Sequence, residues 1–288
     1  MMKSFRNAHY WLMSFSFAGI LDTGGTAYAA SNKPWQLGLP EPVTPVARDL
    51  AFFHDKVLLP LTIVISVFVL GLIIYICWRF SEKNNPTPSK TTHHTLLEVV
   101  WTAVPALILV AVAFPSMSVL YKSDDVGNAD MTLKVTGNQW FWTYEYPDQG
   151  GFIFDANMVQ EEDLPEGREY LRNILTDNVV VLPVDTRIRL QFTSNDVLHN
   201  WSVSDFAVRM DTVPGRLNEA WMTVEKIGEY YGFCSELCGL NHAYMPITVR
   251  VVSKAEFEDW AKNAQAEFAA TPQDALSAPS LLLAEIPN

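Results

Sequence analysis

The stretch CSELCGLNHAYM, residues 234–245, gathers two thiols, an imidazole and a thioether into one short loop. Gly239 allows the chain to turn tightly between these groups. A second imidazole, His199, follows the β-type run at 187–192. Thiolate and thioether sulfur together with imidazole nitrogen select copper over hard cations. The stretch therefore predicts a copper-binding loop late in a β-rich domain.

The two cysteines bear on the kind of metal site. A single blue-copper site uses one Cys, whereas Cys234 and Cys238 suit two thiolates that bridge two copper ions. A disulfide between them is an alternative in an oxidising compartment, although it leaves His242 and Met245 unexplained. A zinc site is another, but Met is a poor zinc ligand. A C-x3-C copper chaperone is the third, and its cysteines would lie early on a helix.

The residues around this loop predict a β domain over about 130–253. Runs at 131–136, 179–182, 187–192 and 247–252 alternate or are β-branched, with Pro, Gly, Asn and Asp between them. Several short strands at this spacing are typical of a sandwich or Greek-key barrel. Residues 255–269 predict a short amphipathic helix on the outside, and the Ala/Pro/Ser-rich tail after Thr271 is expected to be disordered.

An aromatic stripe follows the first of these runs. In GNQWFWTYEY, residues 137–146, alternation predicts that Trp140, Trp142, Tyr144 and Tyr146 share one face of a strand. Such a face belongs in a sandwich core or at a membrane surface. A Trp exposed above a metal site would instead offer a point where electrons enter the domain.

Two uncharged segments, 57–78 and 99–121, predict membrane-spanning helices. At about 1.5 Å per residue each can cross a ~30 Å hydrocarbon core. Proline within them is tolerated when neighbouring helices pack against the kink. Buried core helices are the alternative, and two uncharged segments of this length disfavour it.

The charges and the N-terminus predict the orientation. Residues 1–29 read as a signal peptide with Lys3 and Arg6, an apolar region and a small-x-small site at 27–29, so that the mature chain begins at Ala30. An uncleaved amphipathic N-terminus is the alternative. The basic connection 79–98 favours the cytoplasm. Both arguments place the N-terminus and the β domain outside.

Charge also limits the partners. The net charge of −12 lies mostly in the second half of the chain. An acidic external module repels nucleic acid and anionic lipid and attracts basic proteins, so a role in nucleic-acid binding is not expected. Cys77 stands alone in an apolar run and is expected to act as a small hydrophobic residue.

Over residues 46–260 the chain resembles subunit II of the haem–copper cytochrome c oxidases of bacteria and mitochondria. The resemblance rests on the hairpin, the aromatic stripe and the C-S-E-x-C-G-x-N-H-x-x-M loop. It implies a membrane-anchored all-β protein, with a two-helix hairpin before a cupredoxin-like Greek-key barrel. The implied organisation is a signal peptide at 1–29, an external segment at 30–56, the hairpin at 57–121, the copper domain at 122–260 and a tail at 261–288.

The resemblance also implies a ligand set for a dinuclear copper A centre. Cys234 and Cys238 would bridge both coppers, and His199 and His242 would bind one copper each. Met245 and the backbone carbonyl of Glu236 would be weaker ligands. The Glu236 side chain would help bind a magnesium ion shared with subunit I.

Further roles follow from the resemblance. Trp140 would receive electrons from cytochrome c, and Asp196 and Glu145 would belong to an acidic docking patch. Glu98 would lie at the cytoplasmic mouth of a proton channel, and a helix N-terminal charge favoured by the dipole is an equal alternative. Arg216 would lie near the haem propionates at the subunit I interface.

The implied function is electron transfer from a c-type cytochrome to the haem of subunit I, for oxygen reduction coupled to proton translocation. The expected partners are oxidase subunits I and III in a bacterial plasma membrane, with the copper domain in the periplasm. No C-x-x-C-H occurs, so the cytochrome must be a separate protein. The alternatives are a copper-less quinol oxidase subunit II, a copper-delivery protein and a structural anchor. The intact ligand set argues against the quinol oxidase subunit and the structural anchor. A copper-delivery protein would need exposed, exchangeable ligands, whereas the sequence predicts a buried ligand loop.

Overall fold

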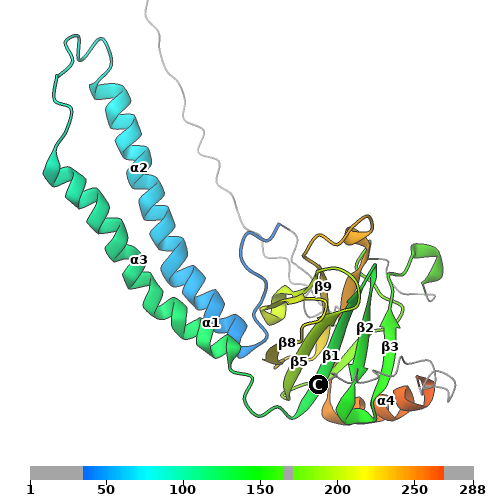
Figure 1. Ribbon diagram of the computed structural model, residues 1–288. Helices are drawn as coiled ribbons and strands as arrows, with labels where there is room; N and C mark the ends of the chain where they lie inside the picture. Colours follow the sequence, from blue (N-terminus) through cyan, green and yellow to red (C-terminus); the bar gives the residue numbers. More distant parts are fainter. Residues whose placement is uncertain (1–34, 165–170, 269–288) are drawn as a thin grey trace, which may run out of the picture.

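A two-helix hairpin and a β-barrel make up the part of the chain that the computed structural model describes, residues 35–164 and 171–268 (Figure 1). The expected signal peptide at 1–29 and the tail after residue 268 lie outside these ranges. The helices are α1 (Pro45–Phe53), α2 (Leu59–Arg79), α3 (Thr95–Asp124) and α4 (Lys254–Glu267). The strands are β1 (Met131–Asn138), β2 (Phe141–Tyr146), β3 (Phe152–Ala156), β4 (Val180–Pro183), β5 (Arg187–Ser194), β6 (His199–Val203), β7 (Val208–Thr212), β8 (Asn218–Thr223), β9 (Gly228–Cys234) and β10 (Pro246–Val252).

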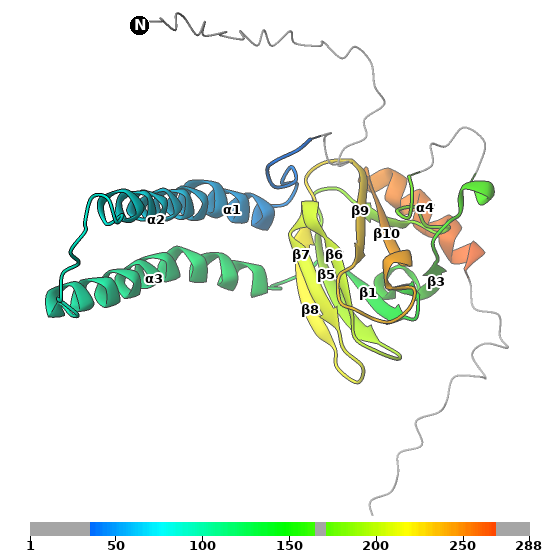
Figure 2. The same cartoon turned by 90° about the horizontal axis from the view of Figure 1, so that it is seen from above.

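The hairpin is built to lie in lipid. Helices α1 and α2 run on from each other through a π-helical turn at His54–Leu58, and α3 returns towards the barrel. The spans Pro45–Arg79 and Thr95–Asp124 are long and apolar enough to cross a membrane, and their most apolar windows have no buried residue. A helix that is apolar on all sides and exposed needs lipid or partner helices around it. Figure 2 shows both helices projecting from the same side of the barrel.

Local signals fix where these helices begin. Thr44 accepts a hydrogen bond from Ala47 N at 3.1 Å and precedes Pro45, so it caps α1 in the way that favours helix initiation. The His94 ring accepts a hydrogen bond from Leu97 N at 3.3 Å at the start of α3. Both helices therefore start at a side-chain cap outside the apolar span.

The barrel consists of two five-stranded sheets. Their strand orders are β3-β2-β1-β5-β8 and β4-β10-β9-β6-β7. The pairs β1–β5 and β4–β10 are parallel, and the other pairs are antiparallel. Strands β1, β2, β3 and β5 alternate between buried and less buried residues, which is the pattern of strands with one face in a core. The prediction of a membrane-anchored all-β, cupredoxin-like fold is confirmed.

The aromatic stripe is only partly as predicted. Trp142, Tyr144 and Tyr146 are buried on one face of β2. Trp140 does not share this face, because β2 begins at Phe141 and Trp140 lies in the turn after β1. Alternation holds only within a strand, so the hairpin turn takes Trp140 out of the core.

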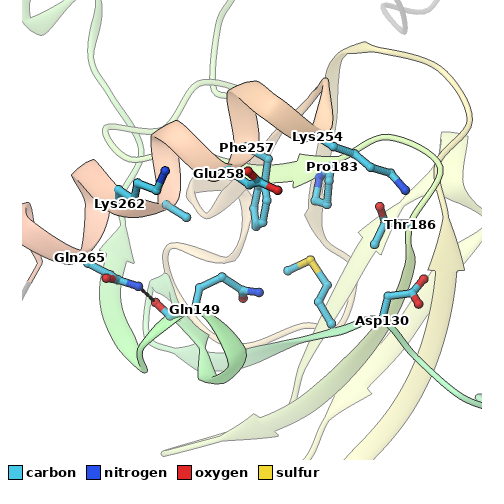
Figure 3. A pocket seen from close by; sticks show the side chains of 11 residues that line it. Asp130, Gln149, Pro183, Thr186, Lys254, Phe257, Glu258, Lys262 and Gln265 are labelled. Carbon is cyan, nitrogen blue, oxygen red and sulfur yellow. Dashed lines mark hydrogen bonds between the residues drawn. The ribbon is translucent and has the colours of Figure 1, made fainter.

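Helix α4 closes the end of the barrel away from the hairpin (Figure 2). It starts with a capping box between Ser253 and Glu256 and buries Phe257, Ala261 and Ala264. At its other end the Gln265 amide donates a hydrogen bond to the Gln149 carbonyl oxygen. A groove of about 560 Å³ remains between α4 and the barrel (Figure 3), and none of its lining residues belongs to the stretch 234–245.

The segment before α1 lies across the barrel. Val43 is 5% exposed and belongs to the core. Its N–H donates to the Asp205 carbonyl oxygen at 3.3 Å, and its own carbonyl accepts from Glu225 N at 3.0 Å. Thr44 Oγ1 donates to the Phe206 carbonyl oxygen at 2.9 Å. The hairpin is therefore joined to the barrel before its first helix begins.

Asp205 lies under this segment and gives the stability of the barrel a pH dependence. Burial raises the pKa of its carboxyl to about 6, with the negative charge of Glu41 adding to the shift. The folded state then binds more protons than the unfolded state between pH ~4 and ~6, so stability falls as pH rises through this window.

We therefore expect Asp205→Asn to raise the stability of the purified chain by about 1–2 kcal/mol at pH 8. The gain should shrink to ~0.5 kcal/mol or less near pH 4, where the carboxyl is protonated in the folded state and about half protonated in the unfolded state. Thermal unfolding at both pH values measures this, with the exposed Asp259→Asn as the matched control. An equal gain at pH 4 and pH 8 would contradict it.

Candidate metal centre

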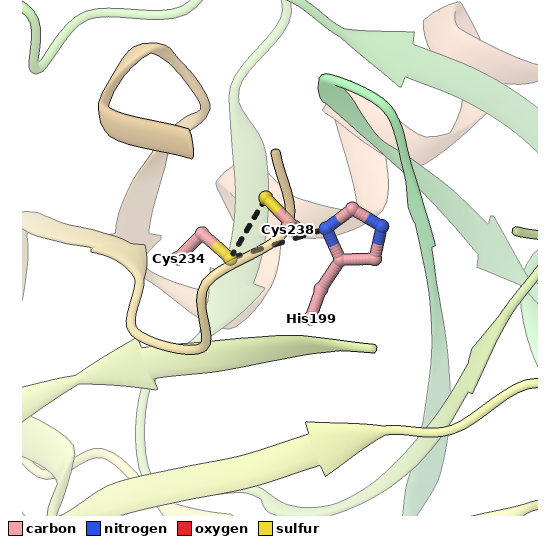
Figure 4. Close-up of side chains that lie close together, drawn as sticks. All are labelled: His199, Cys234 and Cys238. Carbon is pink, nitrogen blue, oxygen red and sulfur yellow. Dashed lines mark hydrogen bonds between the residues drawn. The ribbon is translucent and has the colours of Figure 1, made fainter. Parts of the chain in front are cut away.

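Two strands and one loop bring the predicted ligands together. His199 is the first residue of β6, Cys234 is the last residue of β9, and the two strands pair with each other. The loop then carries Cys238 back over the end of the barrel before β10 begins. His199, Cys234 and Cys238 have ligand atoms within 4.8 Å of one another (Figure 4).

The sulfur atoms form the middle of the cluster. Cys234 Sγ lies 3.9 Å from Cys238 Sγ, well beyond the ~2.05 Å of a disulfide bond, and both thiols are free. Cys238 Sγ also lies 3.5 Å from His242 Nδ1 and 3.5 Å from Met245 Sδ. The disulfide alternative does not describe this geometry.

The remaining donors complete the set. His199 Nδ1 lies 3.9 Å from Cys234 Sγ, and the Glu236 carbonyl oxygen lies 3.3 Å from the same sulfur. The exposed fractions are 0% for His199, 3% for each Cys and 1% for Met245, so most of the donors are withdrawn from water. The Glu236 side chain is exposed at the surface of the loop. Soft sulfur and imidazole donors in a dry site fit copper.

The pKa values of the two thiols are shifted in opposite directions. Burial alone would raise the pKa of Cys234, but the His199 ring and backbone groups of the loop lower it overall. Burial and the negative charge on Cys234 raise the pKa of Cys238. The pair therefore loses its first proton readily and its second only when a cation compensates the charge, so the two thiols suit the binding of a metal ion.

Asp196 orients the most buried ligand. Its Oδ1 accepts a hydrogen bond from His199 Nε2 at 2.9 Å, and its Oδ2 accepts from Gln139 N at 2.7 Å. Burial lowers the pKa of His199, but hydrogen bonds to Cys234 and Asp196 raise it above its ordinary value overall. This bond leaves Nδ1 free to face the sulfur cluster and makes the imidazole a better donor. The sequence placed Asp196 only in a docking patch, yet its spacing three residues before a ligand His was a usable signal.

We expect Asp196→Asn to raise the reduction potential of a copper centre held by this cluster. The negative charge stabilises the oxidised metal, so its loss should shift the potential upward by on the order of 60 mV, tenfold in a one-electron equilibrium. Redox titration of the copper signal measures the shift. Glu145→Gln is the matched control, because the Glu145 carboxylate pairs with Lys134 at 2.7 Å rather than with a residue of the cluster. A potential shift of equal size in both variants would contradict this role.

Trp140 lies directly against the ligand loop. Its Nε1 donates to the Cys238 carbonyl oxygen at 3.2 Å, and the Gln139 amide donates to the same oxygen at 2.8 Å. Trp140 is half-buried, so part of the ring faces solvent. Gly239 allows this approach, because a Cβ there would lie 3.1 Å from the Trp140 ring. The sequence did not predict the part played by Gln139.

The other predicted residues lie elsewhere. Glu98 is in the first turn of α3, where its carboxylate accepts a hydrogen bond from His94 N at 3.4 Å. Arg216 is exposed in the turn between β7 and β8. Glu145 lies along β2, beyond the turn that holds Trp140. The structure therefore brings Asp196 and Trp140 to the metal cluster, but not Glu98, Arg216 or Glu145.

The chain is similar in sequence to known proteins of a single family. The family described as cytochrome c oxidase subunit II, periplasmic domain, matches residues 131–252, and the corresponding transmembrane domain matches residues 32–119. The chain is 40% identical over 253 residues to a probable cytochrome c oxidase subunit 2 from Rickettsia felis, covering 88% of this chain and 79% of that protein. The chain belongs to the cytochrome c oxidase subunit II family.

Other members lie at a similar distance. Subunit 2 from Oenothera berteroana is 44% identical over 237 residues, covering 80% of this chain and 91% of that protein. A solved periplasmic domain of subunit II from Bradyrhizobium japonicum is 46% identical, with a TM-score of 0.46, and covers 50% of this chain and 99% of that chain. As a subunit II, the chain is a membrane-anchored part of an oxidoreductase, and its His199–Cys234–Cys238 cluster fits a copper centre. The quinol oxidase, copper-delivery and anchor alternatives are not supported.

Proposed function

We propose that this chain accepts electrons from a c-type cytochrome at a dinuclear copper centre and delivers them to the haem of oxidase subunit I. The observation that carries this is the convergence of four buried side-chain donors with His242 and a loop carbonyl. A copper pair held there would supply one-electron redox chemistry. Cys234 and Cys238 would bridge the two ions, with the other donors around them.

The protein's own residues provide the path for the incoming electron and hold the donors in position. Trp140 offers a half-exposed ring that is hydrogen-bonded to the Cys238 backbone, so a donor's electron can reach a ligand through few contacts. The Asp196–His199 bond orients one donor, and the burial of His199, Cys234, Cys238 and Met245 excludes water from the donor atoms although the loop surface is exposed. Little then has to reorganise when an electron arrives.

The contacts with partners follow from exposed residues. The exposed Glu236 carboxylate would help bind magnesium at the subunit I interface, and Arg216 would face the haem propionates there. Asp196 and Glu145 would contribute to an acidic surface for a basic cytochrome. Glu98, at the start of the second span, would guide protons into subunit I from the cytoplasm. Subunit III would complete the complex.

The same proposal sets the orientation. The basic connection 79–98 would lie in the bacterial cytoplasm, and the copper domain in the periplasm. Translocation of protons would be carried out by the assembled oxidase.

Metal analysis of the purified full-length chain tests the proposal. We expect two copper ions per chain and an electron paramagnetic resonance signal from one unpaired electron shared equally by both. One copper with a blue-copper spectrum would contradict it, and so would a copper-free chain with Cys234 and Cys238 joined in a disulfide.

A further inference from the structure

At the end of the second membrane helix, only some of the last carbonyl groups find a partner in their own segment, such as the Asp124 carbonyl, which accepts from Val126 N at 3.0 Å. The last carbonyl groups of a helix have no partner within the helix and must find one elsewhere. At the end of α3, the Lys122 carbonyl accepts a hydrogen bond from Trp221 Nε1 at 3.0 Å. The Asp125 carbonyl accepts from Arg187 Nη2 at 2.5 Å, and the Val126 carbonyl accepts from Arg187 Nε at 3.0 Å. The barrel therefore supplies hydrogen-bond donors to one carbonyl of the last helical turn and to the two carbonyls that directly follow α3.

The two capping residues form one unit. Arg187 begins β5 and Trp221 lies on the neighbouring strand β8. The Arg187 guanidinium lies 3.9 Å from the centre of the Trp221 ring, and Trp221 is 8% exposed. A planar guanidinium can stack on a ring and still donate from its edge, which an ammonium group cannot do. Its positive charge also suits the negative end of the helix dipole.

The backbone around Arg187 is shaped for this contact. Gly127 has a φ of +54°, and a Cβ there would lie 3.0 Å from Arg187 Nη2. Asp130 N donates to the Arg187 carbonyl at 2.8 Å, and Asp130 Oδ2 accepts from Arg187 N at 3.0 Å. The connection from α3 to β1 is therefore held at both of its ends by the same arginine.

The first helix joins the same point. Lys122, whose carbonyl receives the Trp221 bond, forms an ion pair with Asp49 of α1. Arg48 of α1 forms a second ion pair with Glu225, just after β8. Both helices are thus tied to the edge of the barrel formed by β5 and β8.

We propose that Arg187, stacked on Trp221, is a positioning residue that fixes the copper-binding barrel on the end of the second membrane helix. We call this connection between the end of α3 and the barrel the joint. The inference rests on the proposed function, since the joint would set the distance from the copper centre to the haem in the membrane. Electron transfer slows steeply with distance, so a loosened joint slows the step that leaves the barrel. The residue acts through geometry and does not contact the metal cluster.

Two measurements on the assembled oxidase test this. The first is the rate of electron transfer from copper to haem after rapid photoreduction. The second is the distance distribution between the copper centre and a spin label placed at Ser89 on a non-natural residue. For Arg187→Gln we expect an unchanged copper spectrum, a broader distribution and a rate lower by on the order of tenfold.

Graded variants keep the test decisive if Arg187→Gln fails to fold. Arg187→Lys should recover part of the rate, and Trp221→Phe should broaden the distribution less, because it keeps the ring and loses only the Lys122 bond. The matched control is Arg250→Gln, which removes a surface arginine paired with Glu229. Native rate and distribution in both Arg187→Lys and Trp221→Phe, or in Arg187→Gln, would overturn the inference.

The joint can also be tested apart from the copper. A pair of spin labels at Ser89 and Lys262 reports the distance between hairpin and barrel without using the metal. If the native chain held no copper pair, the proposed function would fail, while a broader label distribution in Arg187→Gln would still support the joint. A narrow distribution in that variant would refute the joint alone.

Discussion

Replacing Cys238 by serine is expected to abolish the copper centre and the oxidation of cytochrome c. Cys238 Sγ lies within 3.9 Å of Cys234 Sγ, His242 Nδ1 and Met245 Sδ, so its loss removes a donor that contacts three others. A serine hydroxyl is a hard donor that stays protonated and does not bridge copper. Loss of even an outer partner of a ligand costs ten- to a hundredfold, so activity should fall by more than about a hundredfold.

The matched control for this variant is Cys77→Ser. Cys77 lies within α2, far along the sequence from the cluster, and should not affect copper binding. Copper per chain and the oxidation rate of reduced cytochrome c are measured for both variants in the assembled oxidase. Full copper content and native activity in Cys238→Ser would show that the bridging role is wrong.

Replacing Trp140 by leucine should separate electron acceptance from metal binding. The Trp140 side chain supplies no metal-binding atom and bonds to the loop at the Cys238 carbonyl, so the copper content should remain native. Without the ring, a docked donor has no close path to the ligand loop. We expect the rate of copper reduction by cytochrome c to fall on the order of a hundredfold, the cost of misplacing reacting groups by about an ångström.

Two comparisons make the Trp140 result specific. Phe141→Leu removes the neighbouring aromatic ring, which has no group that can donate to the Cys238 carbonyl, and should retain most of the rate. Trp140→Phe should be intermediate, because it keeps a ring and loses the N–H. If Trp140→Leu lost copper in proportion to activity, its role would be structural. If it kept the native rate, electrons would enter elsewhere.

The metal cluster was accessible from the sequence because most of its chemistry is local. Cys234, Cys238, His242 and Met245 lie in one loop, and their donor atoms could be named before their geometry was known. His199 is distant in sequence, but it follows a recognisable strand. The runs at 131–136 and 187–192 were also found, since their alternation reflects burial on one side.

What the sequence could not provide is the pairing of distant segments. Nothing in the alternation of β1 or β5 indicates that they run parallel to each other. The position of Trp140 depends on where the turn between β1 and β2 lies. The alternation of side chains along a strand does not specify where the strand ends. Arg187 stacks on Trp221, and its guanidinium donates to the Asp125 carbonyl just after α3. Because these partners are far away in the sequence, neither residue can be recognised from the sequence alone.

Asp196 shows how one residue can carry two interpretations. An acidic side chain in an acidic domain suggested contact with a basic partner, and that role stays a prediction. The structure adds the hydrogen bond to His199, which depends on a turn that brings residues 196 and 199 together. The variant Asp196→Asn distinguishes the two roles, because only the second changes the reduction potential.

The central claim is that electrons enter the oxidase at the copper centre of this chain. Stopped-flow mixing of reduced cytochrome c with the assembled, oxidised enzyme tests it most directly, with copper and haem absorbance followed separately. We expect the copper band to bleach together with cytochrome oxidation and haem reduction to follow. Haem reduction without prior bleaching of copper would contradict it.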